Sequence, residues 1–100
     1  MFIITETLKP ERIPAGKEEE LFQRHVAWFS RHFESGDFIL VGPYTDAKMA
    51  GVMISAAATR EEVEAILQED VYYADGMADY EVRSFTAAKI AANFADFAGK

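Results

Sequence analysis

The hydrophobic positions near the start of the chain are β-branched and aromatic residues, and this pattern predicts a strand over residues 2–8. Phe2 and Ile4 fall on one face of that strand, and the residues between them fall on the other. Two prolines and a glycine within residues 9–16 then interrupt the pattern. We therefore expect a strand followed by a loop.

From Lys17 the apolar residues recur at steps of three and four, which is the spacing of an amphipathic helix. The stripe is formed by Leu21, Phe22, His25, Val26, Trp28, Phe29, His32 and Phe33. Three glutamates in the first turn complement the helix dipole. Gly36 follows Ser35 and is suited to end the helix in a left-handed conformation. The pattern predicts a helix from Lys17 to Ser35.

Two short apolar runs follow, and turn residues bound them. Residues 37–41 lie between Gly36 and the pair Gly42-Pro43, and they are too few for a helix, so they predict a buried strand. Residues 49–58 are apolar throughout. They predict a second central strand, antiparallel to the one before it.

The sequence TREE at residues 59–62 predicts the start of a second helix, because Thr59 and Glu62 can form a capping box there. Residues 78–85 alternate again and predict a fourth, half-exposed strand. After that strand the spacing becomes helical once more. It predicts a short C-terminal helix that begins at Thr86 and packs either on its own domain or on a partner.

The predicted order is strand, helix, strand, strand, helix, strand, followed by a tail. This is the split βαβ arrangement of ferredoxin-like folds, an α+β class with a four-stranded antiparallel sheet. Helices cover only one face of such a sheet, so the other face requires a second cover. For a small domain the simplest cover is a second copy of the chain. We therefore expect a homodimer, or a higher homo-oligomer, with sheets that face each other.

The chain has 100 residues, half of them hydrophobic, which suffices for one core. We therefore expect a single domain over residues 1–100, with its core in 1–86 and a helical tail in 87–100. A formal charge of −7 disfavours nucleic-acid and anionic lipid partners. Neither the pattern of a signal peptide nor a membrane-spanning run is found. These properties predict a cytoplasmic protein that binds neither nucleic acid nor membranes.

His25 is the candidate for chemistry, because an imidazole can take and return a proton near neutral pH. Its place in the apolar stripe is equally compatible with a hydrogen-bonded core residue, and the pattern leaves both interpretations open. His32 lies two turns away, about 10 Å along a helix, which is too far for both to bind one ion. We therefore expect no metal site and no cofactor. No cysteine is present, which excludes thiolate chemistry.

The chain resembles the YciI-like (YCII-related) proteins of the dimeric α+β barrel superfamily over most of residues 1–86. The matching features are His25, the Gly36 turn, Gly42-Pro43, Asp70 followed by Tyr72, Gly76 and Phe85. Two positions differ from the family pattern. Val71 stands where members usually have proline, and Phe22 lies where an arginine is common.

The resemblance implies a His-Asp pair in a cleft, and by position this pair is His25 and Asp70. Some relatives are similar to enzymes that remove HCl from chlorinated lactones or hydroquinones. We therefore expect a small cofactor-independent enzyme of the lyase, dehydrohalogenase or isomerase type, acting on a small cyclic or aromatic acid or lactone. The alternative is a non-catalytic dimeric module that binds a small metabolite or supports a partner enzyme. Asp70 has a second interpretation as the cap of a short helix.

The candidate substrate-binding residues are Gly42, Pro43, Tyr44, Tyr72 and Arg24. The tyrosines can donate hydroxyl hydrogens to a bound carbonyl, and the Gly-Pro pair lets the following loop pass close to a cleft. Arg24 is the arginine nearest to His25. An enzyme of this kind should direct one ring nitrogen of His25 at a pocket and hold the other within about 3 Å of an Asp70 oxygen.

Overall fold

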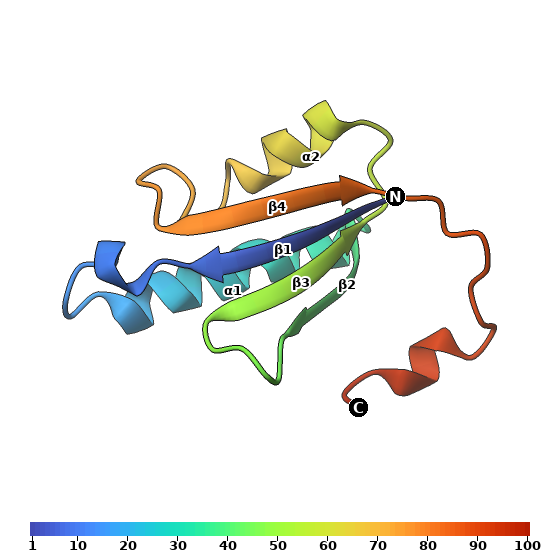
Figure 1. Ribbon diagram of the computed structural model, residues 1–100, viewed down its shortest axis with the longest axis horizontal. Coiled ribbons are helices and arrows are strands. Elements are labelled where there is room, and N and C mark those ends of the chain that lie inside the picture. Colours follow the sequence, from blue (N-terminus) through green and yellow to red (C-terminus); the bar gives the residue numbers. More distant parts are fainter.

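The computed structural model describes residues 1–100 and contains a four-stranded antiparallel sheet with two helices (Figure 1). The strands are β1 (Phe2–Leu8), β2 (Phe38–Pro43), β3 (Ala50–Ser55) and β4 (Ala78–Ser84), and the helices are α1 (Glu18–Glu34) and α2 (Arg60–Leu67). The strand order is β2-β3-β1-β4. The predicted ferredoxin-like α+β arrangement is therefore confirmed. None of the helices combines the length and the apolar composition needed to cross a membrane.

The ends of both helices follow the local sequence. Gly36 has a φ of +89°, so α1 ends at the left-handed glycine that the pattern predicts. At the start of α2, Thr59 Oγ1 accepts a hydrogen bond from the Glu62 amide at 3.2 Å. The Glu62 carboxylate accepts one from the Ala58 amide at 3.0 Å, one residue before the position expected for a capping box. The second helix is therefore capped largely as predicted.

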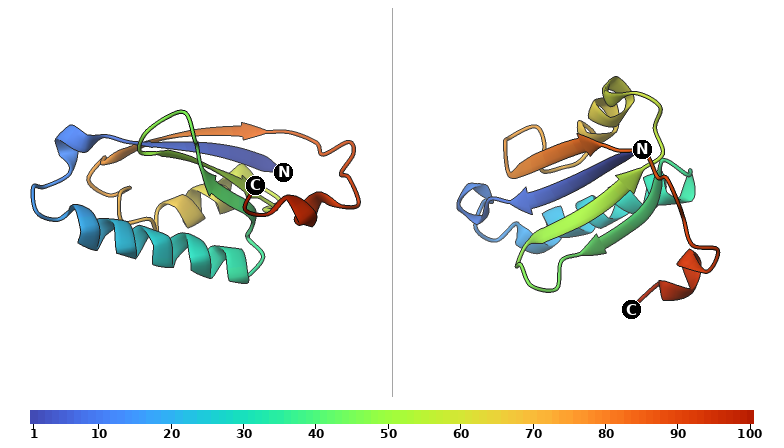
Figure 2. Two further views of the ribbon diagram at one scale, coloured as in Figure 1. Left: turned by 90° about the horizontal axis from the view of Figure 1, so that it is seen from below. Right: turned by 45° about the vertical axis from the view of Figure 1, so that its right-hand side comes forward.

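Both helices lie on the same face of the sheet (Figure 2). The inward residues Phe2 and Ile4 of β1 belong to the main core cluster, together with residues of α1 and α2. Trp28 of α1 is 2 % exposed, and its indole donates to the Ile66 carbonyl at 2.9 Å. This bond fixes the distance between α1 and α2 near the middle of the core.

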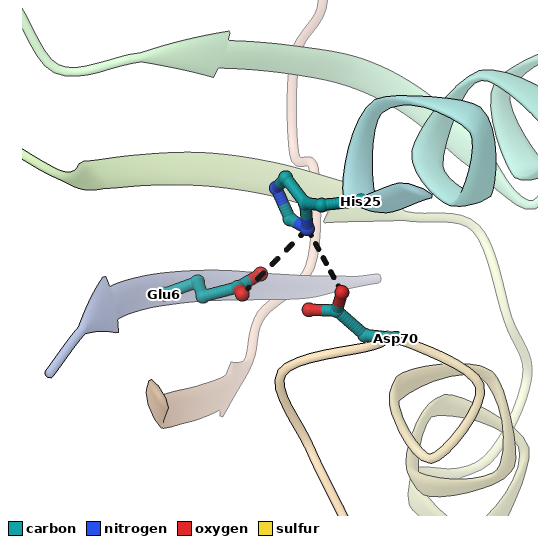
Figure 3. Close-up of side chains that lie close together, drawn as sticks. All are labelled: Glu6, His25 and Asp70. Atoms are coloured by element: carbon teal, nitrogen blue, oxygen red, sulfur yellow. Dashed lines mark hydrogen bonds and ion pairs between the residues drawn. The ribbon is translucent and has the colours of Figure 1, made fainter. Parts of the chain in front are cut away.

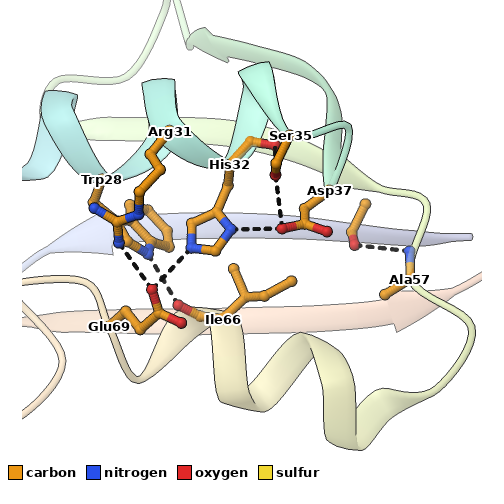
Figure 4. A network of polar contacts seen from close by, with 9 residues as sticks. Trp28, Arg31, His32, Ser35, Asp37, Ala57, Ile66 and Glu69 are labelled. Atoms are coloured by element: carbon orange, nitrogen blue, oxygen red, sulfur yellow. Dashed lines mark hydrogen bonds and ion pairs between the residues drawn. The ribbon is translucent and has the colours of Figure 1, made fainter.

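A polar network fixes the far end of α1 (Figure 4). His32 Nδ1 lies 2.8 Å from Asp37 Oδ2, and His32 Nε2 lies 3.1 Å from Glu69 Oε1. Contact with His32, and with Ser35, lowers the pKa of Asp37, and contact with Arg31 and then His32 lowers the pKa of Glu69. His32 therefore joins α1 to the turn before β2 and to the segment after α2, and it stands apart from His25.

The opposite face of the sheet carries an apolar stripe. Strand pairing places Ile54 beside both Ile3 and Leu40, and it places Val52 beside Thr5. These side chains point away from the helix-covered core and are half-buried. We call this set of five residues the open face. Its composition is that of a surface that another layer can cover.

The predicted C-terminal helix is wrong over most of its length. The only regular structure in the tail is a 3₁₀ turn at Phe94–Phe97, and the tail runs away from the sheet (Figure 1). Ile90 is 59 % exposed and Phe97 is 60 % exposed. Since these side chains bury little apolar area, nothing offsets the unfavourable nucleation of a short helix.

Replacing Ile4 by alanine tests the position of the core. Ile4 is fully buried at 0 % exposure, so Ile4→Ala should lower the free energy of unfolding by about 2–5 kcal/mol. Chemical denaturation measures this loss. The matched control, Ile90→Ala, removes an exposed side chain and should change stability by less than about 0.5 kcal/mol. Equal effects of the two substitutions would contradict the assigned core.

Candidate functional site

A cleft of about 1090 Å³ opens between α1 and the sheet. Its walls come from the end of β1, from α1, from the β2–β3 hairpin and from the segment after α2. Apolar side chains of the wall include Leu8, Ile13, Phe22, Phe29, Val41 and Met53. Lys48 is the single lysine or arginine among the lining residues. The cleft is therefore suited to a small, largely apolar molecule.

His25 reaches this cleft from the middle of α1. Its Nδ1 lies 2.9 Å from Asp70 Oδ1, and its side chain is 14 % exposed. Figure 3 shows the other ring nitrogen directed away from the two neighbouring carboxyl groups. The rings of Trp28, Phe29 and Tyr72 surround the imidazole, with centroid distances of 5.5, 5.3 and 5.1 Å. The ring is thus held in one orientation, in which Nδ1 contacts Asp70 and another part of the ring lines the cleft.

Asp70 lies three residues after α2, and its side chain is completely buried. One carboxylate oxygen contacts His25, and the other accepts a hydrogen bond from the Tyr80 hydroxyl at 2.7 Å. Burial opposes ionisation, but the hydrogen bond with His25 and the contacts with Glu6 and Tyr80 outweigh it and lower the pKa of Asp70. Its side-chain hydrogen bonds are to His25 and Tyr80 and none is to a backbone amide, so the carboxylate does not serve as the helix cap that was the other interpretation.

Glu6 is a third ionisable group of the site, and the sequence pattern did not single it out. Its Oε2 lies 3.8 Å from His25 Nδ1, and neither of its carboxyl oxygens has a hydrogen-bond partner (Figure 3). The residue is 4 % exposed. Burial, and then the neighbouring Asp70 carboxylate, raise the pKa of Glu6 to about 10. Both effects favour the protonated form of Glu6.

A signal for Glu6 does exist in the alternation of β1. Glu6 follows Phe2 and Ile4 at steps of two, so it must point into the same interior. Tyr80 stands directly opposite Glu6 in the pairing of β1 with β4. An ionisable residue at an inward strand position is therefore the sequence signal for Glu6. Tyr80 can be recognised as a site residue only from the strand pairing.

The other predicted site residues divide into two groups. Gly42, Pro43, Tyr44 and Tyr72 line the cleft, whereas Arg24 is exposed and does not. The expected binding role of Arg24 therefore has no support in the geometry, because adjacent residues of a helix point in different directions.

The two cleft tyrosines differ in what their hydroxyl groups can do. The Tyr44 hydroxyl is already paired with Thr5 Oγ1 at 2.9 Å. Burial, and then the charges of Asp70 and Glu6, raise the pKa of Tyr72 to about 12. Tyr72 thus remains a neutral hydroxyl, which is a suitable donor to a ligand oxygen.

One ligand atom from each of Glu6, His25 and Asp70 lies within 4.8 Å of the others. Two carboxylates and an imidazole are donors that divalent transition metals accept. The bonds already made by Nδ1 and by both oxygens of Asp70 compete with a metal, and a proton on Glu6 balances the charge equally well. The bonds already present therefore favour a proton over a metal in this cluster.

Comparison with solved structures identifies a similar fold. One match is 5-chloro-2-hydroxyhydroquinone dehydrochlorinase (TftG) from Burkholderia phenoliruptrix AC1100, in complex with 2,5-dihydroxybenzoquinone. The TM-score is 0.61 and the sequence identity is 14 %, over 86 % of this chain and 94 % of that chain. At this identity the likeness supports the fold alone.

A search of curated proteins finds no match to this chain. The family model described as "YCII-related domain" matches residues 1–86, which include every strand, both helices and all the residues of the site. The chain therefore belongs to the family of proteins with a YCII-related domain.

Proposed function

We propose that this protein is a small enzyme in which His25 moves a proton on a small cyclic or aromatic compound, by a lyase, dehydrohalogenase or isomerase reaction. The observation that supports this most directly is the 2.9 Å contact between His25 Nδ1 and Asp70 Oδ1 in the wall of the cleft. A buried carboxylate behind a histidine orients the ring and stabilises the cation that forms when it accepts a proton.

The contact also supports Nε2 as the nitrogen that acts as the base. Asp70 is ionised, so Nδ1 donates the hydrogen in this bond and Nε2 keeps a lone pair. Nε2 can then remove a proton from a bound ring. In an elimination, the electrons of the broken C–H or O–H bond form a new π bond, the carbon–halogen bond breaks, and halide leaves. The proton stays on Nε2 until it is released to water.

Charge that develops on a ring oxygen in such a step needs a hydrogen-bond donor. Tyr72 is the side chain in the cleft wall suited to this role, because its ring lies 5.1 Å from the imidazole and its hydroxyl stays protonated. The reaction thus requires no group beyond those already gathered around His25. We include Gly42, Pro43 and Tyr44 as residues that shape the opposite wall.

The lining of the cleft supports the proposed substrate class. Apolar side chains dominate the walls, and Lys48 is the single cationic side chain. A hydroxylated or halogenated ring therefore fits better than a compound with several carboxylates. The ligand of the similar structure, 2,5-dihydroxybenzoquinone, is a small ring of this type.

We also propose that the working unit is a homodimer in which the open faces of two sheets pack together. Ile3, Leu40, Val52 and Ile54 form an apolar stripe on that face, and no helix of the chain lies on it (Figure 2). Burial of such a stripe against a second copy is favourable, because it removes apolar surface from water.

Substitution of His25 tests the enzymatic proposal. Chloride release from a panel of small halogenated hydroquinones and lactones should fall by at least about 10²-fold in His25→Gln and in Asp70→Asn, because the base or its orienting carboxylate is lost. The control is Gln23→Ala, an exposed change on the same helix, which should keep full activity. Circular dichroism confirms folding. Turnover that survives in His25→Gln would contradict the proposal, and tight binding without turnover in the wild type would favour the non-catalytic alternative.

A charge on the open face tests the dimer. Ile54→Arg should give a monomer in sedimentation equilibrium where the wild type is a dimer, because two buried arginines would face each other across the interface. The control, Ala27→Arg, adds the same charge to an exposed position of α1 and should remain dimeric. A monomeric wild type, or a dimeric Ile54→Arg, would refute this interface.

A further inference from the structure

We propose that Glu6 is a neutral carboxylic acid in the folded protein, and that its proton keeps His25 available as a base by limiting the site to one negative charge. The inference rests on the role proposed for His25 and assigns Glu6 as a positioning residue for it. Its test does not require turnover.

The first argument is the placement of the carboxyl group. Glu6 is 4 % exposed, neither of its oxygens has a hydrogen-bond partner, and the fully buried Asp70 carboxylate belongs to the same cluster. An ionised carboxylate without partners in such a position is strongly unfavourable. Asp70 receives two hydrogen bonds, from His25 and Tyr80, whereas Glu6 receives none, so Asp70 is the group that ionises. The single proton that two neighbouring carboxyl groups share therefore resides on Glu6.

The second argument concerns the charge that His25 experiences. Its Nδ1 is 2.9 Å from one carboxyl oxygen, that of Asp70, and 3.8 Å from another, that of Glu6. A second negative charge at this separation would favour the charged imidazolium over the neutral ring. A histidine held in that form cannot accept a proton. The proton on Glu6 therefore preserves the lone pair of Nε2.

The third argument is that this arrangement works against folding. Glu6 is an ionised, hydrated side chain in the unfolded protein, and it must take up a proton to be buried. A hydrophobic residue would continue the Phe2 and Ile4 face of β1 without that penalty. An ionisable residue in this position is thus a burden on stability that packing does not explain.

A bound divalent metal is the competing occupant of the same residues. A metal on Nδ1 would replace the hydrogen bond to Asp70 and would leave Nε2 as the protonated nitrogen. Such a site could not use His25 as the proposed base. The two cases therefore predict opposite tautomers of His25. The hydrogen is on Nδ1 if Glu6 is protonated and on Nε2 if a metal is bound.

The decisive experiment is a nuclear magnetic resonance titration of the His25 ring in the full-length protein, comparing wild type with Glu6→Gln. Glutamine has nearly the same shape as glutamic acid and is always neutral, so no charge is lost if Glu6 is already protonated. The midpoint of the His25 titration should then move by less than about one pH unit. A fall of one pH unit or more would overturn the proposal, because it would reveal an ionised Glu6.

Two further measurements complete this test. Infrared difference spectra at neutral pH should contain a carboxylic acid carbonyl band in the wild type that Glu6→Gln removes and that the exposed control Glu34→Gln keeps. Absence of that band would overturn the proposal. Titration with zinc chloride should change the His25 signals little. Tight zinc binding that Glu6→Gln abolishes would overturn the proposal, because a metal and not a proton would then occupy the site. Loss of substrate turnover alone would contradict only the proposed function.

The same substitution should remove a pH dependence of stability. The pKa of Glu6 rises from about 4.5 in the unfolded chain to about 10 in the folded protein, so the wild type loses stability as pH increases through this window. The denaturation temperature of Glu6→Gln should therefore exceed that of the wild type by a margin that grows with pH and is smallest below about pH 4.5. Calorimetry at several pH values measures this difference in denaturation temperature. The control Glu34→Gln should show the same pH dependence as the wild type. A margin independent of pH would contradict the assignment.

Discussion

Two buried carboxyl groups beside one imidazole are the constraint on which this structure depends. They cannot both be ionised at low cost, so the surrounding groups must distinguish between them. Asp70 receives hydrogen bonds from His25 and Tyr80 and keeps the charge, whereas Glu6 receives none and keeps the proton. Four separate elements supply these side chains, namely β1, α1, the segment after α2, and β4. The fold therefore has to hold these four elements at fixed relative positions for the site to exist.

The hydrophobic packing fixes the relative positions of these elements. The main core cluster lies around Trp28, and a smaller cluster lies around Tyr72, while Tyr80 packs against both. The polar residues thus sit where the two clusters meet. Trp28 and His32 bind the segment around α2 from two positions along α1, which fixes the helices against each other. Since the distance from His25 to Asp70 spans these two helical segments, the packing determines the geometry on which the proposed chemistry depends.

Much of the fold was predictable from local pattern, because strand alternation, the Gly36 turn and the Thr59 cap act over a few residues. His25 was a candidate from its side-chain chemistry, its pairing with Asp70 was implied by resemblance, and their contact required the tertiary structure. Glu6 was missed because a lone acid in a strand is usually exposed, even though its inward phase was visible. The C-terminal helix was predicted wrongly, since spacing alone does not provide a surface to bury.

The two faces of β1 connect the proposed chemistry with the proposed assembly. Successive residues of a strand alternate between faces, so Glu6 points toward the cleft while Thr5 points toward the open face. Thr5 bonds the hydroxyl of Tyr44, and Tyr44 belongs to the wall of the cleft. A second copy packed on the open face would therefore press on the same strand and the same tyrosine that border the site. Since a site that moves protons needs its groups held within fractions of an ångström, a rigid cover on that face is a physical reason for the protein to associate.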